Sequence, residues 1–300
     1  MAKSDAAGLF LATILALSTA MPAGAQTLSE RIGRSDPGEL REASGVHAGA
    51  GSMRFGTLLG ADALSTNLIF VHTGVIMPKS GIGQHFHNQC EEMFVILDGE
   101  AEFTIDGRTS LIAGPAAVPD RMGHSHAIYN PTDKPLRWLN VNVGMTKNYD
   151  NFDLGDPREG AELDDIPQFI SVRFDQTQLR AVQGMDGGTG EVRYRRALQP
   201  SVFSTPWSYV DHLVVPPSAS VGNAAKPGMS EVLYVISGAG EVTVDGEVAA
   251  VVPGDAVPVD VGQARAIRST GDGQLELMII GVAKDLAAKA EYAASQARPR

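Results

Sequence analysis

Apolar positions along this chain fall into short runs, and each run is closed by a turn signal. The runs at 67–77 and 92–97 are almost wholly apolar, whereas apolar and polar residues alternate over 100–105, just before the dipeptide Asp106-Gly107. Alternation with a period of two indicates a strand with one buried face, and Asp-Gly is a typical hairpin turn. Shorter runs of the same kind follow at 116–119, 125–129 and 136–143. Short strands at regular spacing predict an antiparallel sandwich or barrel.

The same pattern recurs 139 residues further along the chain. Apolar runs stand at 207–215, 232–236, 240–244 and 275–282. The turn residues recur at the same offset without a gap: Pro78, Gly99, Asp106, Gly107 and Pro119 become Pro217, Gly238, Asp245, Gly246 and Pro258. A constant offset over so many landmarks predicts that the two halves of the chain share one fold.

We therefore expect an all-β chain of two tandem domains with a short C-terminal helix. Residues 26–60 show little periodicity and are predicted to be a mostly irregular arm. The segment between the two copies is rich in loop signals, with one strand expected near 169–174. The Ala- and Lys-rich end of the chain favours a helix. The expected segments are a first domain at 26–150, a linker at 151–190, a second domain at 191–283 and a helical tail at 284–300.

Residues 1–25 have the organisation of a secretory signal peptide. Lys3 precedes an apolar run over residues 6–20, and the small-residue pattern Ala23-Gly-Ala25 stands just before Gln26. The run is short for a membrane anchor and rich in Ala, Ser and Thr, although an uncleaved anchor is the alternative interpretation. We expect export to the periplasm or out of the cell, cleavage near Gln26 and no membrane insertion afterwards.

The net charge restricts the class of partner, and the cysteine count restricts how the fold can be stabilised. The net charge of −11 argues against nucleic acid as a partner, because phosphate backbones attract basic surfaces. The single cysteine, Cys90, cannot form an internal disulfide, so the fold cannot depend on one in an oxidising compartment. Cys90 lies between candidate metal ligands, and ligation by its sulfur is one interpretation. We expect it instead to be a small residue at the start of a buried strand.

The first copy contains three histidines and a glutamate at spacings that suit a metal site. His85 and His87 are two residues apart, so on a strand their side chains point to the same face. Glu92 begins the next predicted strand, and His126 comes from a later hairpin. Three imidazoles and one carboxylate suit a mid-row divalent metal (Mn, Fe, Co, Ni, Cu or Zn) better than Ca or Mg. We expect one such ion per chain, with positions open for water, substrate or O₂.

These motifs resemble those of the cupin family. The run Gly81-x3-His85-x-His87-x4-Glu92-x6-Gly99 resembles the first cupin motif, except that Gly81 is two residues nearer the histidines than usual. The second is resembled by Pro119 followed by His126-x3-Asn130, in which the histidine is two residues further from the proline than usual. The duplicated arrangement resembles a bicupin over roughly residues 60–283. The resemblance implies a jelly-roll β-barrel in each copy, a metal inside the first, and a small-molecule ligand. Cupins often dimerise, so it also implies a homo-oligomer or a bicupin that acts as its own dimer.

The choice between Glu91 and Glu92 follows from spacing. Only Glu92 has the six-residue gap to Gly99, and only Glu92 corresponds to an acid, Glu231, in the second copy. Glu91 is therefore expected to point outward as a solvated carboxylate.

The choice between His124 and His126 is less direct. Spacing from Pro119 favours His124, whereas the repeat aligns His126 with Arg265 and favours His126 as the ligand. The two histidines share parity, so both can face the barrel interior. We assign His126 to the metal, and name His124 together with Glu92 as candidate catalytic residues that handle protons.

The second copy has lost the three histidines. Ala224, Lys226 and Arg265 stand in their places, while Glu231 is retained. Cationic Lys and Arg cannot replace imidazole as metal ligands. We expect no metal in the second copy and a scaffold role for it. A buried cluster of Lys226, Glu231 and Arg265 that binds an anion is the alternative.

The expected lining of the first barrel indicates the class of substrate. Parity with the ligands points a set of side chains inward, and an apolar lining with a few amides suits a modest organic substrate, aromatic or sugar-derived. The expected pocket residues are Phe94, Ile96, Ile128, Trp138 and Asn140. We expect a metal-dependent, oxygenase-type enzyme of the dioxygenase kind. The alternatives are a redox-neutral isomerase, lyase or decarboxylase, in which the metal is a Lewis acid, and a non-catalytic binding protein. The n-region lacks a twin arginine, so the ion is expected to bind outside the cytoplasm, where the affinity order favours Cu and Zn.

Overall fold

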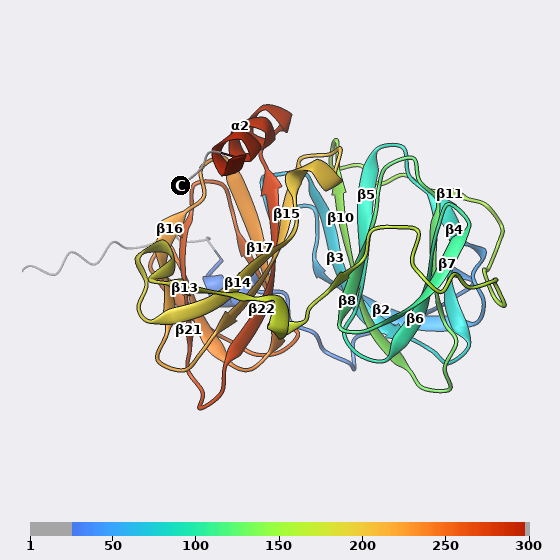
Figure 1. Cartoon of the computed structure of the whole chain (residues 1–300), viewed down its shortest axis with the longest axis horizontal. Helices are drawn as coiled ribbons and strands as arrows, with labels where there is room; N and C mark the ends of the chain where they lie inside the picture. The colour runs from blue at the N-terminus through green and yellow to red at the C-terminus, as the bar shows by residue number, and fades with distance from the viewer. Residues whose placement is uncertain (1–25, 298–300) are drawn as a thin grey trace, which may run out of the picture.

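The computed structural model describes residues 26–297, so the predicted signal peptide at 1–25 lies outside the described residues. The described part of the chain forms two β-barrel units side by side, with a helix across one end of the second (Figure 1). The all-β prediction with a short C-terminal helix is confirmed. Among the described residues, no helix has the length and apolar composition needed to cross a bilayer.

The first barrel is built from a seven-stranded and a five-stranded sheet. Its strands are β1 (Arg41–Ser44), β2 (Ser52–Leu59), β3 (Leu68–Ile76), β4 (Ser80–Phe86), β5 (Cys90–Ile96), β6 (Glu100–Ile105), β7 (Arg108–Ala113), β8 (Ala116–Asp120), β9 (His126–Asn130), β10 (Leu136–Gly144), β11 (Phe152–Asp153) and β12 (Val172–Arg173). The sheet orders are β1-β2-β3-β10-β5-β8-β12 and β11-β4-β9-β6-β7, and the strand pairs are antiparallel.

The second barrel repeats this plan with a six-stranded and a four-stranded sheet. Its strands are β13 (Arg180–Gln183), β14 (Glu191–Leu198), β15 (Trp207–Val215), β16 (Ser220–Ala225), β17 (Met229–Ser237), β18 (Gly240–Val244), β19 (Glu247–Val251), β20 (Ala256–Val259), β21 (Ala264–Ser269) and β22 (Leu275–Ala283). The sheet orders are β13-β14-β15-β22-β17-β20 and β16-β21-β18-β19. The helices are α1 (Leu28–Arg31) and α2 (Leu286–Ala297), with 3-10 turns η1 (Val46–Ala48), η2 (Gln176–Gln178), η3 (Met185–Gly187) and η4 (Pro200–Val202).

The repeat begins earlier than the sequence patterns indicated. The offset of 139 places β1 on β13, η1 on η3 and β2 on β14, each with the same bounds. The expectation that residues 26–60 are mostly irregular is therefore wrong for 41–59, and β13 lies in the predicted linker. Edge strands such as β1 are exposed on both faces, so they carry no apolar alternation that would reveal them.

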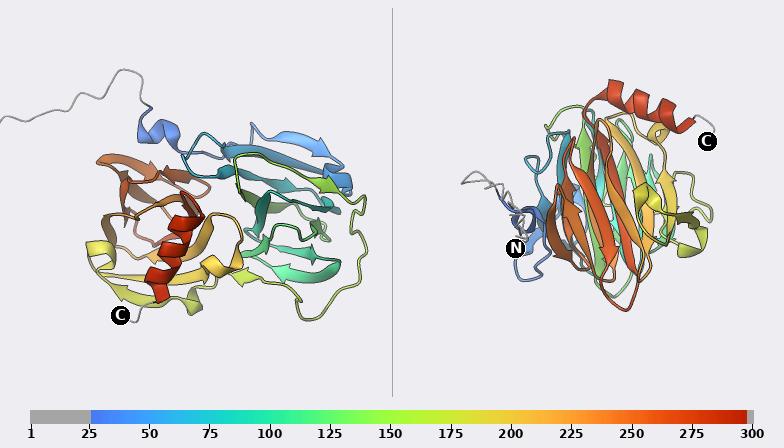
Figure 2. Two further views of the ribbon diagram at one scale, coloured as in Figure 1. Left: turned by 90° about the horizontal axis from the view of Figure 1, so that it is seen from above. Right: turned by 90° about the vertical axis from the view of Figure 1, so that its left-hand side faces the viewer.

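The start of the described chain belongs spatially to the second barrel. Leu28 and Ile32 are buried in the core of that barrel, and Gly33 exchanges two backbone hydrogen bonds of 2.9 Å with Ala256 at the start of β20. Figure 2 shows α1 lying against the second barrel, although the strands that follow it join the first. The arm therefore ties the two barrels together.

The apolar residues form three clusters that match this architecture. One cluster fills the first barrel, one fills the second, and the third lies between the two large sheets. In the third cluster, Leu139 and Val141 of β10 pack with Val210 of β15 and Ile280 of β22. The outer face of each large sheet is thus buried against its partner, which leaves the two barrel interiors as separate compartments.

Candidate metal centre

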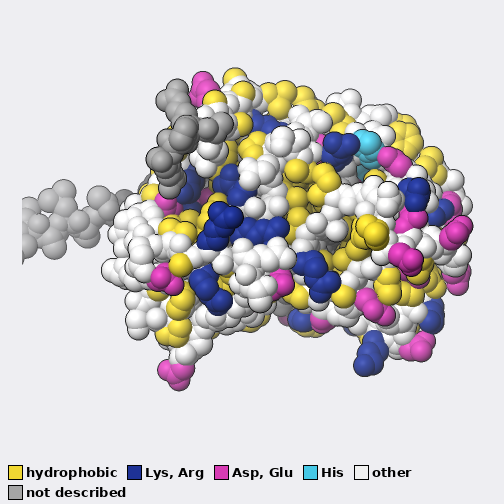
Figure 3. Space-filling model, in the orientation of Figure 1, with side chains coloured by type: hydrophobic (Ala, Val, Ile, Leu, Met, Phe, Trp, Pro, Cys, Tyr) yellow, Lys and Arg dark blue, Asp and Glu magenta, His cyan; other side chains and the backbone are white. Residues whose placement is uncertain are grey.

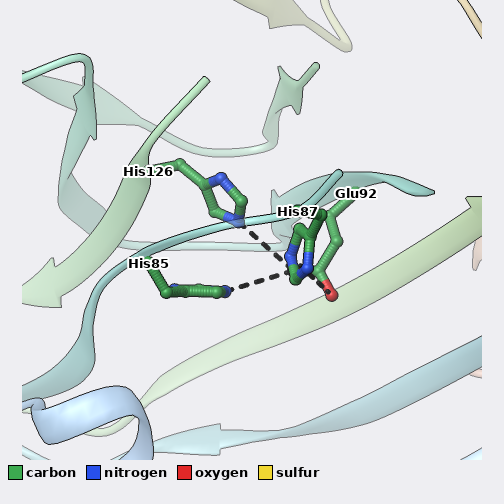
Figure 4. A group of neighbouring side chains, drawn as sticks. All are labelled: His85, His87, Glu92 and His126. Carbon is green, nitrogen blue, oxygen red and sulfur yellow. Dashed lines mark ion pairs between the residues drawn. The ribbon is translucent and has the colours of Figure 1, made fainter. Parts of the chain in front are cut away.

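Three histidines and one glutamate converge inside the first barrel (Figure 4). His85 lies near the end of β4 and His87 just beyond it, Glu92 lies on β5, and His126 begins β9. Their ligand atoms all lie within 4.8 Å of one another, and all four side chains are buried. The Nε2 atoms of His85, His87 and His126 stand 3.9, 3.6 and 3.5 Å from the nearest Glu92 oxygen. The four predicted ligands thus form one cluster.

Backbone carbonyls orient the three imidazoles. The Nδ1 atom of His85 lies 2.8 Å from the Gly83 oxygen, that of His126 lies 3.3 Å from the His124 oxygen, and that of His87 contacts the Asp150 oxygen. A ring that donates from Nδ1 keeps the lone pair of Nε2 free for a metal. All three Nε2 atoms are buried without a hydrogen-bond partner. Buried polar atoms rarely stay unpaired, so this donor set fits a divalent transition metal.

Two asparagines on β10 hold the carboxylate in place. Asn142 donates to Glu92 Oε1 at 2.9 Å, and Asn140 donates to Oε2 at 3.3 Å. Burial by itself raises the pKa of Glu92, but the neighbouring imidazoles of His126, His85 and His87 lower it well below its usual range. Burial lowers the pKa of His126 to about 4. Burial also disfavours a charge on His87, but the nearby Cys90 and Glu92 raise its pKa to about 11. A metal cation that binds here therefore displaces the proton of His87.

Cys90 is buried at the start of β5, as expected for a small residue there. Its sulfur lies 3.4 Å from the Asn142 amide nitrogen and 3.7 Å from an Asp150 oxygen. His87, Cys90 and Asp150 also form a group with metal-ligand spacing. Because this group shares His87 with the four-residue cluster, the two sets are alternatives for that imidazole.

The prediction that Glu91 is solvated is wrong. Its side chain is fully buried and accepts hydrogen bonds from the backbone of Ser204 at 2.9 Å and of Thr205 at 2.9 Å. The Thr205 hydroxyl donates a further bond at 2.7 Å. Glu91 does point away from the barrel interior, as parity requires, but the second barrel covers that face of β5. A single-barrel pattern could not reveal this contact.

His124 does not reach the barrel interior. Its side chain is about one-third exposed, and its Nδ1 lies 2.6 Å from Asp106 Oδ2. Its Nε2 lies 2.9 Å from a guanidinium nitrogen of Arg121. The parity argument fails because β9 begins only at His126, so residue 124 stands in the preceding turn. The structure therefore separates His124 from the proton-handling role that was predicted for it.

A cavity of about 340 Å³ opens beside the metal ligands. Of the predicted pocket residues, Phe94, Trp138 and Asn140 line it together with His85 and Glu92. Ile96 and Ile128 are instead buried in the apolar core of the barrel and are not among the lining residues. The alternation of side chains along a strand correctly predicts that Ile96 and Ile128 point inward, but it does not give their depth along the barrel axis. The other lining residues are Val46, His47, Met53, Phe55, Phe70, His72, Ile82 and Tyr149.

His47 is the most notable residue that the sequence reasoning missed. Its ring stacks on His85 at 3.8 Å between centroids, and its Nδ1 lies 2.5 Å from Asp153 Oδ1. The Tyr149 hydroxyl lies 3.4 Å from its Nε2. The available signal was the glycine spacing around position 47, since Gly45, Gly49 and Gly51 recur as Gly184, Gly188 and Gly190 at the offset of 139. His47 thus contacts the predicted metal ligand His85 and also lines the cavity.

The second barrel replaces the metal cluster by ion pairs. Arg265 donates to Glu231 at 2.9 Å and to Asp186 at 2.9 Å, and the Tyr209 hydroxyl donates to Glu231 at 2.8 Å. Lys226 pairs with Asp186. The alternative interpretation, a cluster of Lys226, Glu231 and Arg265 that binds an anion, required Lys226 to lie beside Glu231 instead. Among the described residues of this barrel, no second group with metal-ligand spacing occurs.

Comparison with known proteins identifies the fold family. The family model described as "Cupin domain" matches residues 73–142 and 211–281, once in each barrel. The chain is therefore a bicupin, with two cupin domains in tandem and one cluster of three histidines and a glutamate, in the first. The curated "Oxalate-binding protein" of Thermotoga maritima is 27% identical over 109 residues, which cover 36% of this chain and 90% of that protein.

Several solved structures share the two-barrel architecture. Oxalate decarboxylase from Bacillus subtilis matches with a TM-score of 0.59 and 16% identity, over 90% of this chain and 78% of that one. Salicylate 1,2-dioxygenase from Pseudaminobacter salicylatoxidans matches with a TM-score of 0.57 and 16% identity, over 79% and 76%. Procruciferin, an 11S globulin from Brassica napus, matches with a TM-score of 0.63 and 13% identity, over 88% and 87%. At these identities the likeness establishes the fold alone.

Proposed function

We propose that this chain is an exported, metal-dependent bicupin that performs oxygenase-type chemistry on a small organic molecule. One observation carries the proposal: three unpartnered Nε2 atoms cluster with one carboxylate, and two of these four residues, His85 and Glu92, line a cavity of about 340 Å³. A ligand set of this kind fills only part of the coordination sphere of a mid-row metal, so substrate and O₂ can bind beside each other. When bound, the metal supplies the redox chemistry.

The cavity favours a planar, largely apolar substrate. Phe55, Phe70, Phe94, Trp138 and Tyr149 contribute aromatic side chains to its lining. Among its lining residues there is no lysine or arginine that could pair with a second carboxylate. Aromatic rings pack well against such walls, whereas a small dicarboxylate would leave one charge without a partner away from the metal. We therefore infer a monoaromatic acid or a similar ring as substrate rather than oxalate.

The protein's own groups position the reactants. Asn140 and Asn142 fix the Glu92 carboxylate, while carbonyl oxygens at the Nδ1 atoms fix the imidazoles. His47, held by Asp153, and His72 place polar atoms on the wall of an otherwise apolar cavity. The surrounding apolar walls exclude water, which strengthens the hydrogen bonds made inside. His47 and His72 are thus the candidates to orient a polar substituent of the ring.

The test is turnover of salicylate and of oxalate under air and under argon. The full chain is loaded separately with Fe²⁺, Mn²⁺, Cu²⁺ and Zn²⁺, and O₂ uptake is followed together with substrate loss. A dioxygenase consumes one O₂ for each salicylate and stops under argon. Turnover that persists under argon contradicts the oxygenase and supports the redox-neutral alternative. Tight binding without turnover that persists after chelation supports a binding protein.

Two matched variants give the control. His126→Ala removes a ligand in the first barrel and should abolish turnover, because the metal is lost. Lys226→Met alters the position that corresponds to His87 in the second barrel. It should leave turnover unchanged if the chemistry belongs to the first barrel alone. We also propose that the ion is acquired outside the cytoplasm, which metal analysis of the chain purified from the native compartment tests.

A further inference from the structure

The second barrel has a cavity at the place that corresponds to the cavity beside the histidine and glutamate cluster of the first barrel. This cavity has a volume of about 1070 Å³ and is lined by Asp186, Tyr209, Asp211 and Arg265, among others. At the offset of 139 these four residues correspond to His47, Phe70, His72 and His126, which line the metal cavity or bind the metal. Residues of α2, including Tyr292, form one wall. A barrel that served only as scaffold has no need of such a space.

The walls carry a continuous network of paired charges. Asp186 bridges Lys226, at 2.9 Å, and Arg265, at 2.9 Å. Arg196 pairs with Asp211 and donates to the Tyr292 hydroxyl at 2.6 Å. The guanidinium of Arg196 also lies 4.2 Å from the centre of the Tyr209 ring. In Figure 3, Lys and Arg side chains gather over the strands β13 and β14, on the face that borders this wall.

Stability does not account for the buried part of this network. The side chains of Arg265, Glu231 and Asp211 are 2%, 3% and 8% exposed, so their charges have lost most of their hydration. Buried ion pairs typically contribute no more than apolar residues of the same volume, and frequently less. The network is therefore better explained by recognition of a ligand.

The charge balance identifies the class of that ligand. Two charged residues of the lining, Lys284 and Glu291, are exposed and of opposite sign. Among the others, Asp186, Asp211 and the deeper Glu231 already neutralise three cations: Lys226, Arg196 and Arg265. An anion or a cation would have to displace one member of these pairs. A hydroxyl group can accept a hydrogen bond from a cation and donate one to a carboxylate without breaking either pair. The tyrosine rings add apolar faces against which C–H groups can pack.

From this balance we propose that the second barrel is a metal-free binding site for a neutral polyhydroxylated molecule of the carbohydrate type. The cavity can hold a mono- or disaccharide. The proposal concerns a different cavity from the metal centre and stands independently of the proposed oxygenase.

Sugars that share one skeleton and differ in charge give a direct test. Binding of D-glucose, D-gluconate and D-glucosamine to the full chain is measured by saturation-transfer NMR and calorimetry, with L-arabinose and maltose as further neutral probes. We expect at least one neutral sugar to bind with a Kd of ~1 mM or lower, and more tightly than either charged analogue. Tighter binding of gluconate, tighter binding of glucosamine, or no binding of any neutral sugar would each overturn the proposal.

Variants separate this site from the metal centre. Tyr292→Phe removes one hydroxyl from an exposed helix and should raise the sugar Kd about fivefold with the fold unchanged. Asp211→Asn replaces one carboxylate oxygen by an amide N–H donor and removes the charge that pairs with Arg196, so it should raise the sugar Kd about tenfold. His126→Ala, in the first barrel, should leave sugar binding unchanged. If His126→Ala abolishes sugar binding while Tyr292→Phe and Asp211→Asn do not affect it, the sugar binds at the metal cavity and the proposal is wrong.

Discussion

The Thr205 hydroxyl donates a hydrogen bond to Glu91 at 2.7 Å, and its counterpart 139 residues earlier, Thr66, makes a 2.6 Å hydrogen bond with Ser230, the counterpart of Glu91. The two barrels therefore meet through a pair of equivalent contacts, one in each direction. Such reciprocity is what a two-fold interface between identical subunits requires. Of the two contacts, only the one between Thr205 and Glu91 involves a charged group. Glu91 lies on β5, next to the candidate metal ligand Glu92.

We expect Glu91→Gln to weaken metal binding in the first barrel. The amide oxygen can still accept, but its nitrogen faces the backbone N–H of Ser204 or Thr205, so one buried donor loses its partner. The loss should lower the free energy of unfolding by about 1–3 kcal/mol. Because Glu92 is the next residue, metal affinity should fall about tenfold, as for other changes that support a ligand indirectly. Competition with a chromogenic chelator measures the affinity.

Ser230→Ala is the matched control at the other half of the interface. It removes the contact with Thr66 and should cost about 1 kcal/mol of stability. Metal affinity should not change, because β17 carries no metal ligand among the described residues. Equal losses of metal affinity in the two variants would show that the interface acts through overall stability and not through β5.

The fold could be predicted from the sequence because the two copies align at a constant offset of 139 residues. The pair Glu92 and Asn142 in the first barrel corresponds to Glu231 and Gly281 in the second, and both are ladder partners in the structure. The turn at Asp106 recurs at Asp245, with φ of 49° and 48°. What periodicity could not find was the exposed edge strand β1, which has no buried face to mark it.

The site was predicted in part, and the limits have physical causes. His85 and His126 lie on the neighbouring strands β4 and β9, and Glu92 lies on β5 of the other sheet of the same barrel. Spacing within the motifs and the repeat were enough to select them. His47 lies in an irregular turn with φ of 50°, where no periodicity applies. Glu91 appeared to be a surface residue because its partners, Ser204 and Thr205, are more than a hundred positions away. Contacts between barrels cannot be derived from a pattern within one.

Metal content should be one ion per chain and should depend on the first barrel alone. His126→Ala removes a ligand that is fully buried, so metal content measured by mass spectrometry should fall close to zero. Chelation of the unaltered chain should lower its Tm, because a metal that binds only the folded state stabilises it by mass action. Lys226→Met should keep both the metal and the chelation-dependent Tm change. Two ions per chain would contradict the assignment of the second barrel.

The contribution of His72 to the stability of the metal-free protein should fall as pH falls below about 6.5. Burial lowers the pKa of His72 to about 4, so the unfolded chain takes up a proton that the folded chain does not. This contribution to stability is therefore present above the unfolded pKa and is lost as pH falls toward 4. Between pH 7 and pH 5 the loss should be about 1–2 kcal/mol.

Urea unfolding of the unaltered chain and of His72→Gln, both metal-free, at pH 7, 6 and 5 checks this sign. Glutamine is neutral throughout, so the difference in unfolding free energy between the two proteins should shift in favour of the variant as pH falls. A constant difference over this range would mean that His72 does not titrate differently in the folded and unfolded states.

The second barrel should be unable to regain a metal site by restoring ligands alone, because Tyr209 occupies the space. A Cβ atom on Gly281 would lie 2.1 Å from Cζ of the Tyr209 ring, so Gly281→Ala should lower the free energy of unfolding by about 2–4 kcal/mol. Tyr209→Ala opens that space, and in the double variant Gly281→Ala should cost much less. A double-mutant cycle by urea unfolding measures this coupling. Additive costs for the two second-barrel changes would show that the tyrosine ring does not hold the glycine in place.

Asn142 is the residue at the same position in the first barrel, and it has no such constraint. Asn142→Gly should therefore keep the fold. It should raise the metal Kd about tenfold, because the hydrogen bond from Asn142 to Glu92 is lost.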